Sequence, residues 1–85
     1  MKVAFEIIAL AEYAEWQAKD AKIARKIYEL IQSIVRDGPM AGIGKPEKLK
    51  GRNGMYSRRI DKENRLTYLY SATEITITHC KGHYE

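Results

Sequence analysis

Cysteine and histidine are scarce in this sequence, and the shortage limits the chemistry open to it. Its 85 residues include one cysteine and two histidines. The single thiol, Cys80, excludes an internal disulfide and fits a reducing compartment. There is no Cys-x-x-Cys pair and no cluster of carboxylates near the histidines. We therefore expect neither a metal site nor a cofactor.

Long apolar runs are also missing. No stretch approaches the roughly 18 apolar residues of a membrane-spanning helix. The opening "MKVAFEIIALAEYAEW" is interrupted by Glu6, Glu12 and Glu15, and no clear cleavage site of small residues follows, so we expect no signal peptide. With 45% hydrophobic and 31% charged residues, the composition is typical of a folded protein. We expect residues 1–85 to form a single cytoplasmic domain without membrane contact.

The positive charge is concentrated in one quarter of the chain. Residues 45–65 carry eight basic and three acidic side chains, whereas the whole chain has a formal net charge of +4. The entire surplus therefore lies in this segment. A concentrated positive field attracts polyanions and speeds their encounter with the protein. An ordinary, well-solvated basic surface would carry the same charges.

The first part of the sequence predicts a strand and a helix. "KVAF" at residues 2–5 alternates as a short strand does, and helical spacing follows from about Ile7 to Lys19. On this helix, Leu10, Tyr13 and Ala14 form the more apolar face.

A second helix is expected from Ala21 to Asp37. Asp20 is a good N-cap, because its side-chain oxygen can accept a hydrogen bond from a backbone N–H of the first turn. Gly38 and Pro39 form the expected stop. One apolar stripe recurs at three- and four-residue steps: Ile23, Ile27, Leu30, Ile31 and Ile34.

After a glycine-rich loop at residues 38–46, the period changes to two. "MYSRRID", "RLTYLYSA" and "EITITHC" alternate and are joined by short connections, which predicts an antiparallel meander. Two helices then cover one face of this sheet, so the predicted class is α+β. Side chains expected to face the helices are Ile60, Leu66, Ile75 and Ile77. Those expected on the open face are Arg59, Arg65, Thr76 and Thr78. In "EITITHC", His79 alternates with Ile75 and Ile77, and Cys80 alternates with Thr76 and Thr78.

Residues able to cut RNA without a metal occur in and after the basic segment. RNA supplies its own nucleophile, so a protein need only accept the 2′-hydroxyl proton, stabilise charge at phosphorus and protonate the departing 5′-oxygen. Glu47 can serve as the base, and Arg59 and Arg65 can offer planar N–H forks to phosphate oxygens. His83 titrates near neutrality and suits the acid, while Tyr84 can hydrogen-bond the phosphate or the leaving oxygen.

The same residue types also have ordinary structural roles. Each of them occurs commonly as a surface side chain or a salt-bridge partner. A thiol enzyme that pairs Cys80 with His79 or His83 is disfavoured, because residues so close on one strand seldom meet as nucleophile and base. "GIGKPE" lacks the spacing of a phosphate-binding glycine loop and precedes a strand.

Four stretches of the sequence carry a family resemblance: "EYAEWQAKD", "GKPEKLKG", "YSRRIDKENRLTYLY" and "CKGHYE". In this order they resemble the YoeB/Txe branch of the RelE superfamily of bacterial toxins over essentially the whole chain. The resemblance implies a RelE-like microbial RNase fold and a ribosome-dependent mRNA endonuclease. The implied roles are Glu47 as general base, Arg65 as transition-state stabiliser, His83 as general acid, Tyr84 as a positioning group, and Lys50 and Arg59 as phosphate contacts.

The resemblance also implies partners. These are mRNA in the A site of the 70S ribosome and an acidic antitoxin of the YefM/Axe type, with operator DNA contacted only through the antitoxin complex. A homodimer is a further expectation, since a chain this small buries only somewhat over ~60% of its unfolded surface. Two other functions remain open: a non-catalytic basic module that acts with an antitoxin on operator DNA, and a toxin that blocks ribosomes without cutting.

Overall fold

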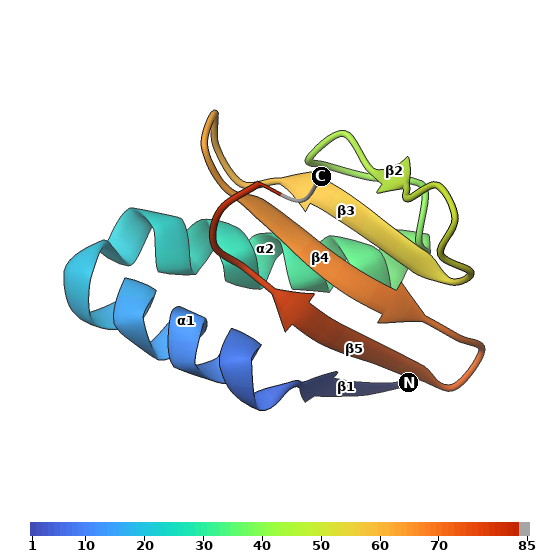
Figure 1. Ribbon diagram of the computed structural model, residues 1–85, viewed down its shortest axis with the longest axis horizontal. Helices are drawn as coiled ribbons and strands as arrows, with labels where there is room; N and C mark the ends of the chain where they lie inside the picture. The colour runs from blue at the N-terminus through green and yellow to red at the C-terminus, as the bar shows by residue number, and fades with distance from the viewer. Residues whose placement is uncertain (84–85) are drawn as a thin grey trace.

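The computed structural model describes residues 1–83. In this part of the chain, two helices pack on a five-stranded sheet of order β1-β5-β4-β3-β2 (Figure 1). β1 runs parallel to β5, and all other neighbours are antiparallel. The predicted α+β class and meander (β3, β4, β5) are confirmed. The elements are β1 (Lys2–Phe5), α1 (Ile7–Lys19), α2 (Ala21–Asp37), β2 (Glu47–Lys48), β3 (Met55–Arg59), β4 (Arg65–Tyr70) and β5 (Glu74–His79).

Local signals set both ends of α2. Asp20 Oδ1 accepts from the backbone N–H groups of Lys22 and Ile23, each at 3.2 Å. At the other end, Gly38 has a φ of 92°, a conformation that favours glycine. No helix within residues 1–83 is long and apolar enough to cross a lipid bilayer. The predicted stripe faces the core: Ile27, Leu30 and Ile34 are fully buried, and Ile23 and Ile31 are partly buried.

The buried face of α1 does not coincide with its more apolar face. Of the three residues on the more apolar face, only Tyr13 packs against the core, whereas Leu10 and Ala14 are exposed. Ala9 is fully buried instead. Trp16 donates from Nε1 to the backbone carbonyl oxygen of Cys80, the residue after β5, at 2.8 Å. The rotation of α1 is therefore set by its contacts with the sheet, which outweigh the apolar side chains that the sequence offers elsewhere on the helix.

The core lies between α2 and the sheet. The predicted inward residues Ile60, Leu66, Ile75 and Ile77 are all buried. The short edge strand β2 was not predicted, because its two residues are ordered by pairing with β3. That pairing places the end of the glycine-rich loop on the sheet.

A β-bulge overturns the predicted alternation at the end of β5. One extra residue, Thr78, lies between the β5 positions that pair with Thr67 and Tyr68. Beyond the bulge, the faces are exchanged relative to the prediction. Cys80 is fully buried and His79 is exposed, which is the reverse of what strict alternation requires.

Candidate active site

Two predicted site residues from strands on either side of β3 meet at the open face of the sheet. Glu47 lies in β2, and Arg65 is the first residue of β4. Glu47 Oε1 is 3.1 Å from Arg65 Nη2. The Arg65 side chain is 12% exposed, whereas that of Glu47 is 62% exposed. A carboxylate that can move in solvent is thus paired with a guanidinium that is largely fixed.

One buried nitrogen of the Arg65 guanidinium, Nη2, has no hydrogen-bond partner in the described part of the chain. This atom forms an ion pair with Glu47, but the contact lacks hydrogen-bond geometry. Leaving a buried donor unsatisfied costs about 1–3 kcal/mol, so such groups are uncommon in native proteins. An anionic oxygen at this position would satisfy the donor with a charge-assisted hydrogen bond.

Ser57 holds the Arg65 side chain in place. Its Oγ accepts from Arg65 Nε at 3.0 Å, and the residue is only 2% exposed. Ser57 lies in the middle of β3, where its backbone is opposite Glu47 in β2 and Thr67 in β4. The same residue therefore orients the guanidinium and lies opposite Glu47, which fixes the two site residues relative to each other.

The C-terminal segment is anchored to α1 where it leaves β5. The backbone N–H of Cys80 donates to Glu12 Oε1 at 2.8 Å, and the Cys80 carbonyl accepts from Trp16 Nε1 at 2.8 Å. Both backbone groups of Cys80 are thus bound by one helix. This contact fixes the direction in which the chain continues.

The same segment then returns to the start of β4 (Figure 1, red). Gly82, at a φ of 79°, accepts from Arg65 N at 3.0 Å and donates to Asn64 Oδ1 at 2.8 Å. His83 follows directly; it is exposed, and its Nε2 lies 2.9 Å from the Lys62 carbonyl oxygen. The backbone next to His83 is therefore bonded to Arg65. Tyr84, the remaining predicted catalytic residue, lies outside the described residues.

The turn between β3 and β4 is organised by Asp61. Its Oδ1 accepts from the backbone N–H groups of Glu63 and Asn64, each at 2.8 Å. Burial alone would raise the pKa of the Asp61 carboxyl, but these hydrogen bonds and the neighbouring His83 bring it below its usual value. Asp61 also accepts from the Asn64 side chain, which in turn receives the Gly82 N–H. The turn thereby supports the C-terminal segment.

The two predicted phosphate contacts lie at the margins of this arrangement. Arg59 ends β3, is exposed, and is opposite Arg65 in the β3–β4 ladder. Lys50 is exposed in the turn after β2. The structure thus brings Glu47, Arg59 and Arg65 to one face, while Lys50 lies beyond the edge strand.

The open face carries hollows rather than one deep pocket at the predicted residues. A hollow of about 320 Å³ adjoins His83, and another of about 300 Å³ is lined in part by Met55 and Leu69, but neither Glu47 nor Arg65 lines either of them. Such a face suits an extended polymer better than an enclosed small molecule, which usually binds in a deep pocket. The hollow beside His83 is lined by Glu12, Thr67, His79, Lys81, Gly82 and His83.

Thiol chemistry is not supported by the structure. Burial, followed by the nearby charge of Glu12, raises the pKa of Cys80 to about 12. The thiol therefore stays protonated at neutral pH and is a poor nucleophile. Within residues 1–83, no group of three or more histidine, cysteine, aspartate or glutamate side chains is arranged to hold a metal ion.

Sequence reasoning missed Ser57 and Arg58. Ser57 orients Arg65, and Arg58 is fully buried on the helix-facing side of β3. The alternation of "MYSRRID" did place Arg58 on the same face as Ile60. An arginine on an apolar face was therefore a signal that could have marked it for a buried hydrogen-bonding role.

Residues 5–84 match the family described as YoeB-like toxin of bacterial type II toxin–antitoxin system. Toxin YoeB of Synechocystis sp. is 42% identical over 86 residues, covering 100% of this chain and 99% of that protein. Toxin YoeB of Mycobacterium bovis is 46% identical and covers 96% of both chains. Toxin YoeB of Escherichia coli K12 is 40% identical over 99% of this chain and 100% of that protein.

Solved structures give the same likeness. The YoeB dimer from Staphylococcus aureus has a TM-score of 0.94 at 46% identity, covering 99% of this chain and 98% of that chain. The heterotetrameric YoeB–YefM toxin–antitoxin complex from the same organism has a TM-score of 0.90, with the same identity and coverage. A chain of the E. coli DinJ–YafQ complex, at 14% identity and a TM-score of 0.77, covers 96% of this chain and 92% of that chain and shares the fold alone. The predicted toxin fold is confirmed.

Proposed function

This chain belongs to the family of YoeB-like toxins of bacterial type II toxin–antitoxin systems, and from that premise we propose that it is a ribosome-dependent mRNA endonuclease. It enters the A site of the 70S ribosome, cuts the message there and so inhibits translation. The reaction uses the nucleophile that RNA itself carries.

The chemistry is an acid–base transfer across one phosphate. Glu47 accepts the 2′-hydroxyl proton, and the 2′-oxygen attacks the adjacent phosphorus. Arg65 donates from Nη2 to a phosphate oxygen as negative charge builds up there. His83 gives a proton to the 5′-oxygen as its bond to phosphorus breaks, which leaves a 2′,3′-cyclic phosphate and a free 5′-hydroxyl. Tyr84 positions the leaving oxygen, and Lys50 and Arg59 contact the flanking phosphates.

The unsatisfied donor of Arg65 beside Glu47 is the observation that supports this proposal most directly. An arginine with a purely structural role would have its donors satisfied by the protein. Here Ser57 fixes the guanidinium through Nε, while Nη2 faces an exposed carboxylate. A substrate phosphate at Nη2 would displace that carboxylate and leave Glu47 able to accept a proton.

The proposed protein partner is an acidic antitoxin of the YefM/Axe type. The surplus of basic side chains in residues 45–65 offers it a complementary charge. A relative from S. aureus has been solved as a heterotetrameric complex with YefM and also as a dimer. We propose that this chain forms a complex of the same kind and is silenced in it, contacts operator DNA only as part of that complex, and dimerises when free.

An in vitro translation reaction followed by primer extension on the message tests the activity. The wild type should truncate the message at the codon in the A site. His83→Ala should slow this cleavage by about 10²–10⁴, the usual contribution of a general acid.

Two other outcomes would contradict the proposal. Ribosomes stalled on an intact message would indicate a toxin that blocks without cutting. Normal translation, combined with operator DNA binding that requires the antitoxin, would indicate a non-catalytic binding module.

A further inference from the structure

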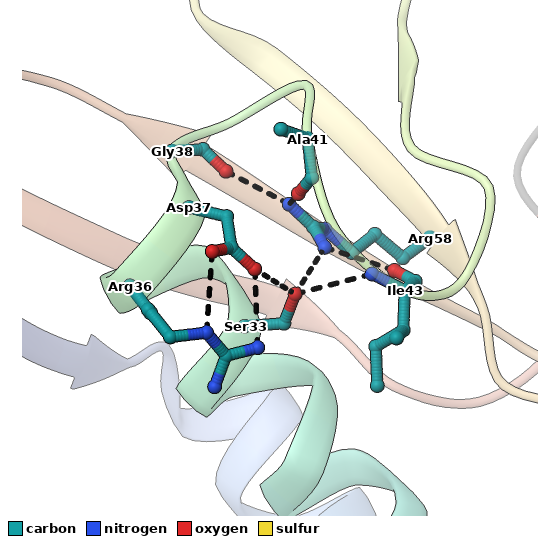
Figure 2. Close-up of polar contacts among 7 residues, drawn as sticks. All are labelled: Ser33, Arg36, Asp37, Gly38, Ala41, Ile43 and Arg58. Carbon is teal, nitrogen blue, oxygen red and sulfur yellow. Dashed lines mark hydrogen bonds and ion pairs between the residues drawn. The ribbon is translucent and has the colours of Figure 1, made fainter.

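The guanidinium of Arg58 is buried and extensively hydrogen-bonded. The side chain leaves β3 on the face opposite Ser57, is 0% exposed, and points into the loop that follows α2 (Figure 2). Its three nitrogens donate to two side-chain oxygens and three backbone carbonyls over 2.6–3.0 Å. The acceptors are Ser33 Oγ, Tyr68 OH and the carbonyl oxygens of Gly38, Ala41 and Ile43.

These contacts join three parts of the molecule. Ser33 belongs to α2, Tyr68 belongs to β4, and the three carbonyls belong to the loop at residues 38–46. Ser33 Oγ also accepts from the backbone N–H of Ile43 at 3.2 Å. The loop is therefore held by hydrogen bonds from a buried cation. A planar guanidinium suits this task, because its donors point in fixed directions.

The glycines of the loop permit this close approach. A Cβ at Gly42 would collide with Ser33 Oγ, and Gly42 has a φ of 99°. A Cβ at Gly44 would collide with the Leu30 side chain, at a φ of 88°. The loop is thus shaped to lie directly against Arg58 and α2.

The loop leads directly into Glu47. The Gly44 carbonyl accepts from Arg59 N at 2.6 Å, and Lys45 and Pro46 then connect to β2. β2 has only two residues, so its pairing with β3 contributes little by itself. The position of Glu47 relative to Arg65 therefore depends on where the loop is held.

We propose that Arg58 is a positioning residue for Glu47, an inference that rests on the proposed nuclease function. By fixing the 38–46 loop, Arg58 keeps the Glu47 carboxylate at the distance from Arg65 that proton acceptance requires. It acts on catalysis through Glu47 and makes no contact with RNA.

A double-mutant cycle of mRNA cleavage on ribosomes tests this role. Arg58→Lys keeps the charge but cannot reach the acceptors on both sides of the loop. We expect kcat to fall about tenfold to hundredfold, the scale of a displaced catalytic group, with KM little changed. In a Glu47→Ala background, the same substitution should cause no further loss, because the group that it positions is absent. Arg36→Lys, an exposed neighbour in Figure 2 that pairs with Asp37, is the matched control and should cleave as the wild type does.

The results that would contradict the role of Arg58 differ from those that would contradict the proposed nuclease function. An equal loss of kcat from Arg58→Lys in both backgrounds would show that Arg58 only supports the fold, with the nuclease function intact. Wild-type cleavage that Glu47→Ala does not slow would also overturn the inference. A wild type that leaves mRNA whole would overturn the proposed function and the inference together. If Arg58→Lys does not fold, Tyr68→Phe removes one acceptor and preserves the ring, and it enters the same cycle with a smaller expected loss.

Discussion

Arg58 and Arg65 lie on neighbouring strands, and both are held within the sheet, but their donors are used differently. Arg58 is fully buried, and all three of its nitrogens donate to protein oxygens. Arg65 donates from Nε to Ser57 and has a buried Nη2 without a hydrogen-bond partner in the described chain. One guanidinium is satisfied by the fold, and the other has a donor available to a ligand.

This difference shows why burial alone does not identify a functional arginine. A satisfied guanidinium stabilises the native state, because its removal leaves several carbonyls without donors. An unsatisfied one costs stability in the free protein and recovers that free energy when an anion binds. Substitutions at the two positions should therefore separate stability from activity.

The largest expected effect is on stability at Arg58. Arg58→Met leaves four buried or half-buried acceptors without their donor, while Ser33 Oγ keeps that of Ile43 N, so the free energy of unfolding should fall by about 3–5 kcal/mol. Urea unfolding followed by circular dichroism measures this loss. Arg36→Met removes an exposed arginine from the adjacent ion pair with Asp37 and should change stability by less than about 1 kcal/mol. Equal losses in the two variants would contradict the structural role of Arg58.

At Arg65 the expected effect is on the rate. Arg65→Lys replaces a planar fork by a point charge, and cleavage of mRNA on ribosomes should slow by about 10²–10³, the usual cost of a lost donor to the transition state. Its unfolding free energy should change little. Arg25→Lys, in an exposed ion pair with Glu29 on α2, should change neither quantity. A stable Arg65→Lys variant that cleaves at the wild-type rate would remove Arg65 from the mechanism.

A substitution at Ser57 tests whether the orientation of the Arg65 guanidinium affects the cleavage rate, with a smaller expected effect. Ser57→Ala removes the acceptor of Arg65 Nε, so the guanidinium is oriented less well. A hydrogen bond of this kind contributes about 0.5–1.5 kcal/mol, which corresponds to a loss of up to about tenfold in cleavage rate. Ser71→Ala, in the exposed β4–β5 turn, is the control and should keep the wild-type rate. A rate loss in Ser71→Ala equal to that in Ser57→Ala would argue against this role of Ser57.

Sequence predicted the elements whose ends are set by local signals. Asp20 and Gly38 mark the ends of α2 through their own backbone and side-chain chemistry, so α2 was placed correctly. The apolar pattern of α1 did not show which of its faces is buried, because contacts such as that of Trp16 with the carbonyl oxygen of Cys80 set its rotation. Strand β2 and the bulge at Thr78 arise from pairing between strands, which alternation within one segment does not reveal.

The residues of the candidate site also fall into a group that the sequence predicted and a group that it missed. Glu47, Arg65 and His83 were selected by the chemistry of their side chains and by the family resemblance. Ser57 and Arg58 were missed, because their roles depend on partners from other elements. Side-chain chemistry thus nominates the groups that meet a substrate, whereas the groups that position them become visible only in three dimensions.

The smallest expected effect is the loss of stability in acid. This loss should be greater at the candidate site than at the 38–46 loop that Arg58 holds. Each region has a carboxylate whose pKa is lowered. For Asp37 the main cause is the hydrogen bond from Arg36. At Asp61, hydrogen bonds from the turn outweigh the effect of burial. A carboxylate whose pKa is lower in the folded state than in the unfolded state stabilises the protein at pH values above its unfolded pKa, which is about 3.9 for aspartate. This stabilisation is lost as the pH falls through the folded pKa.

Urea midpoints measured between pH 7 and pH 3 for Asp37→Asn and Asp61→Asn test this difference. Asparagine keeps an acceptor oxygen at either position but cannot titrate. Asp61→Asn should reduce the loss of stability in acid more than Asp37→Asn does, because Asp61 is bound by several N–H groups of an ordered turn, whereas Asp37 has an exposed and easily screened partner in Arg36. The turn at Asp61 also holds Asn64 against Gly82, so acid should loosen the C-terminal segment beside Arg65 before it affects the loop around Arg58. If the loss of stability in acid is the same in the wild type and in both variants, neither carboxylate is responsible for it.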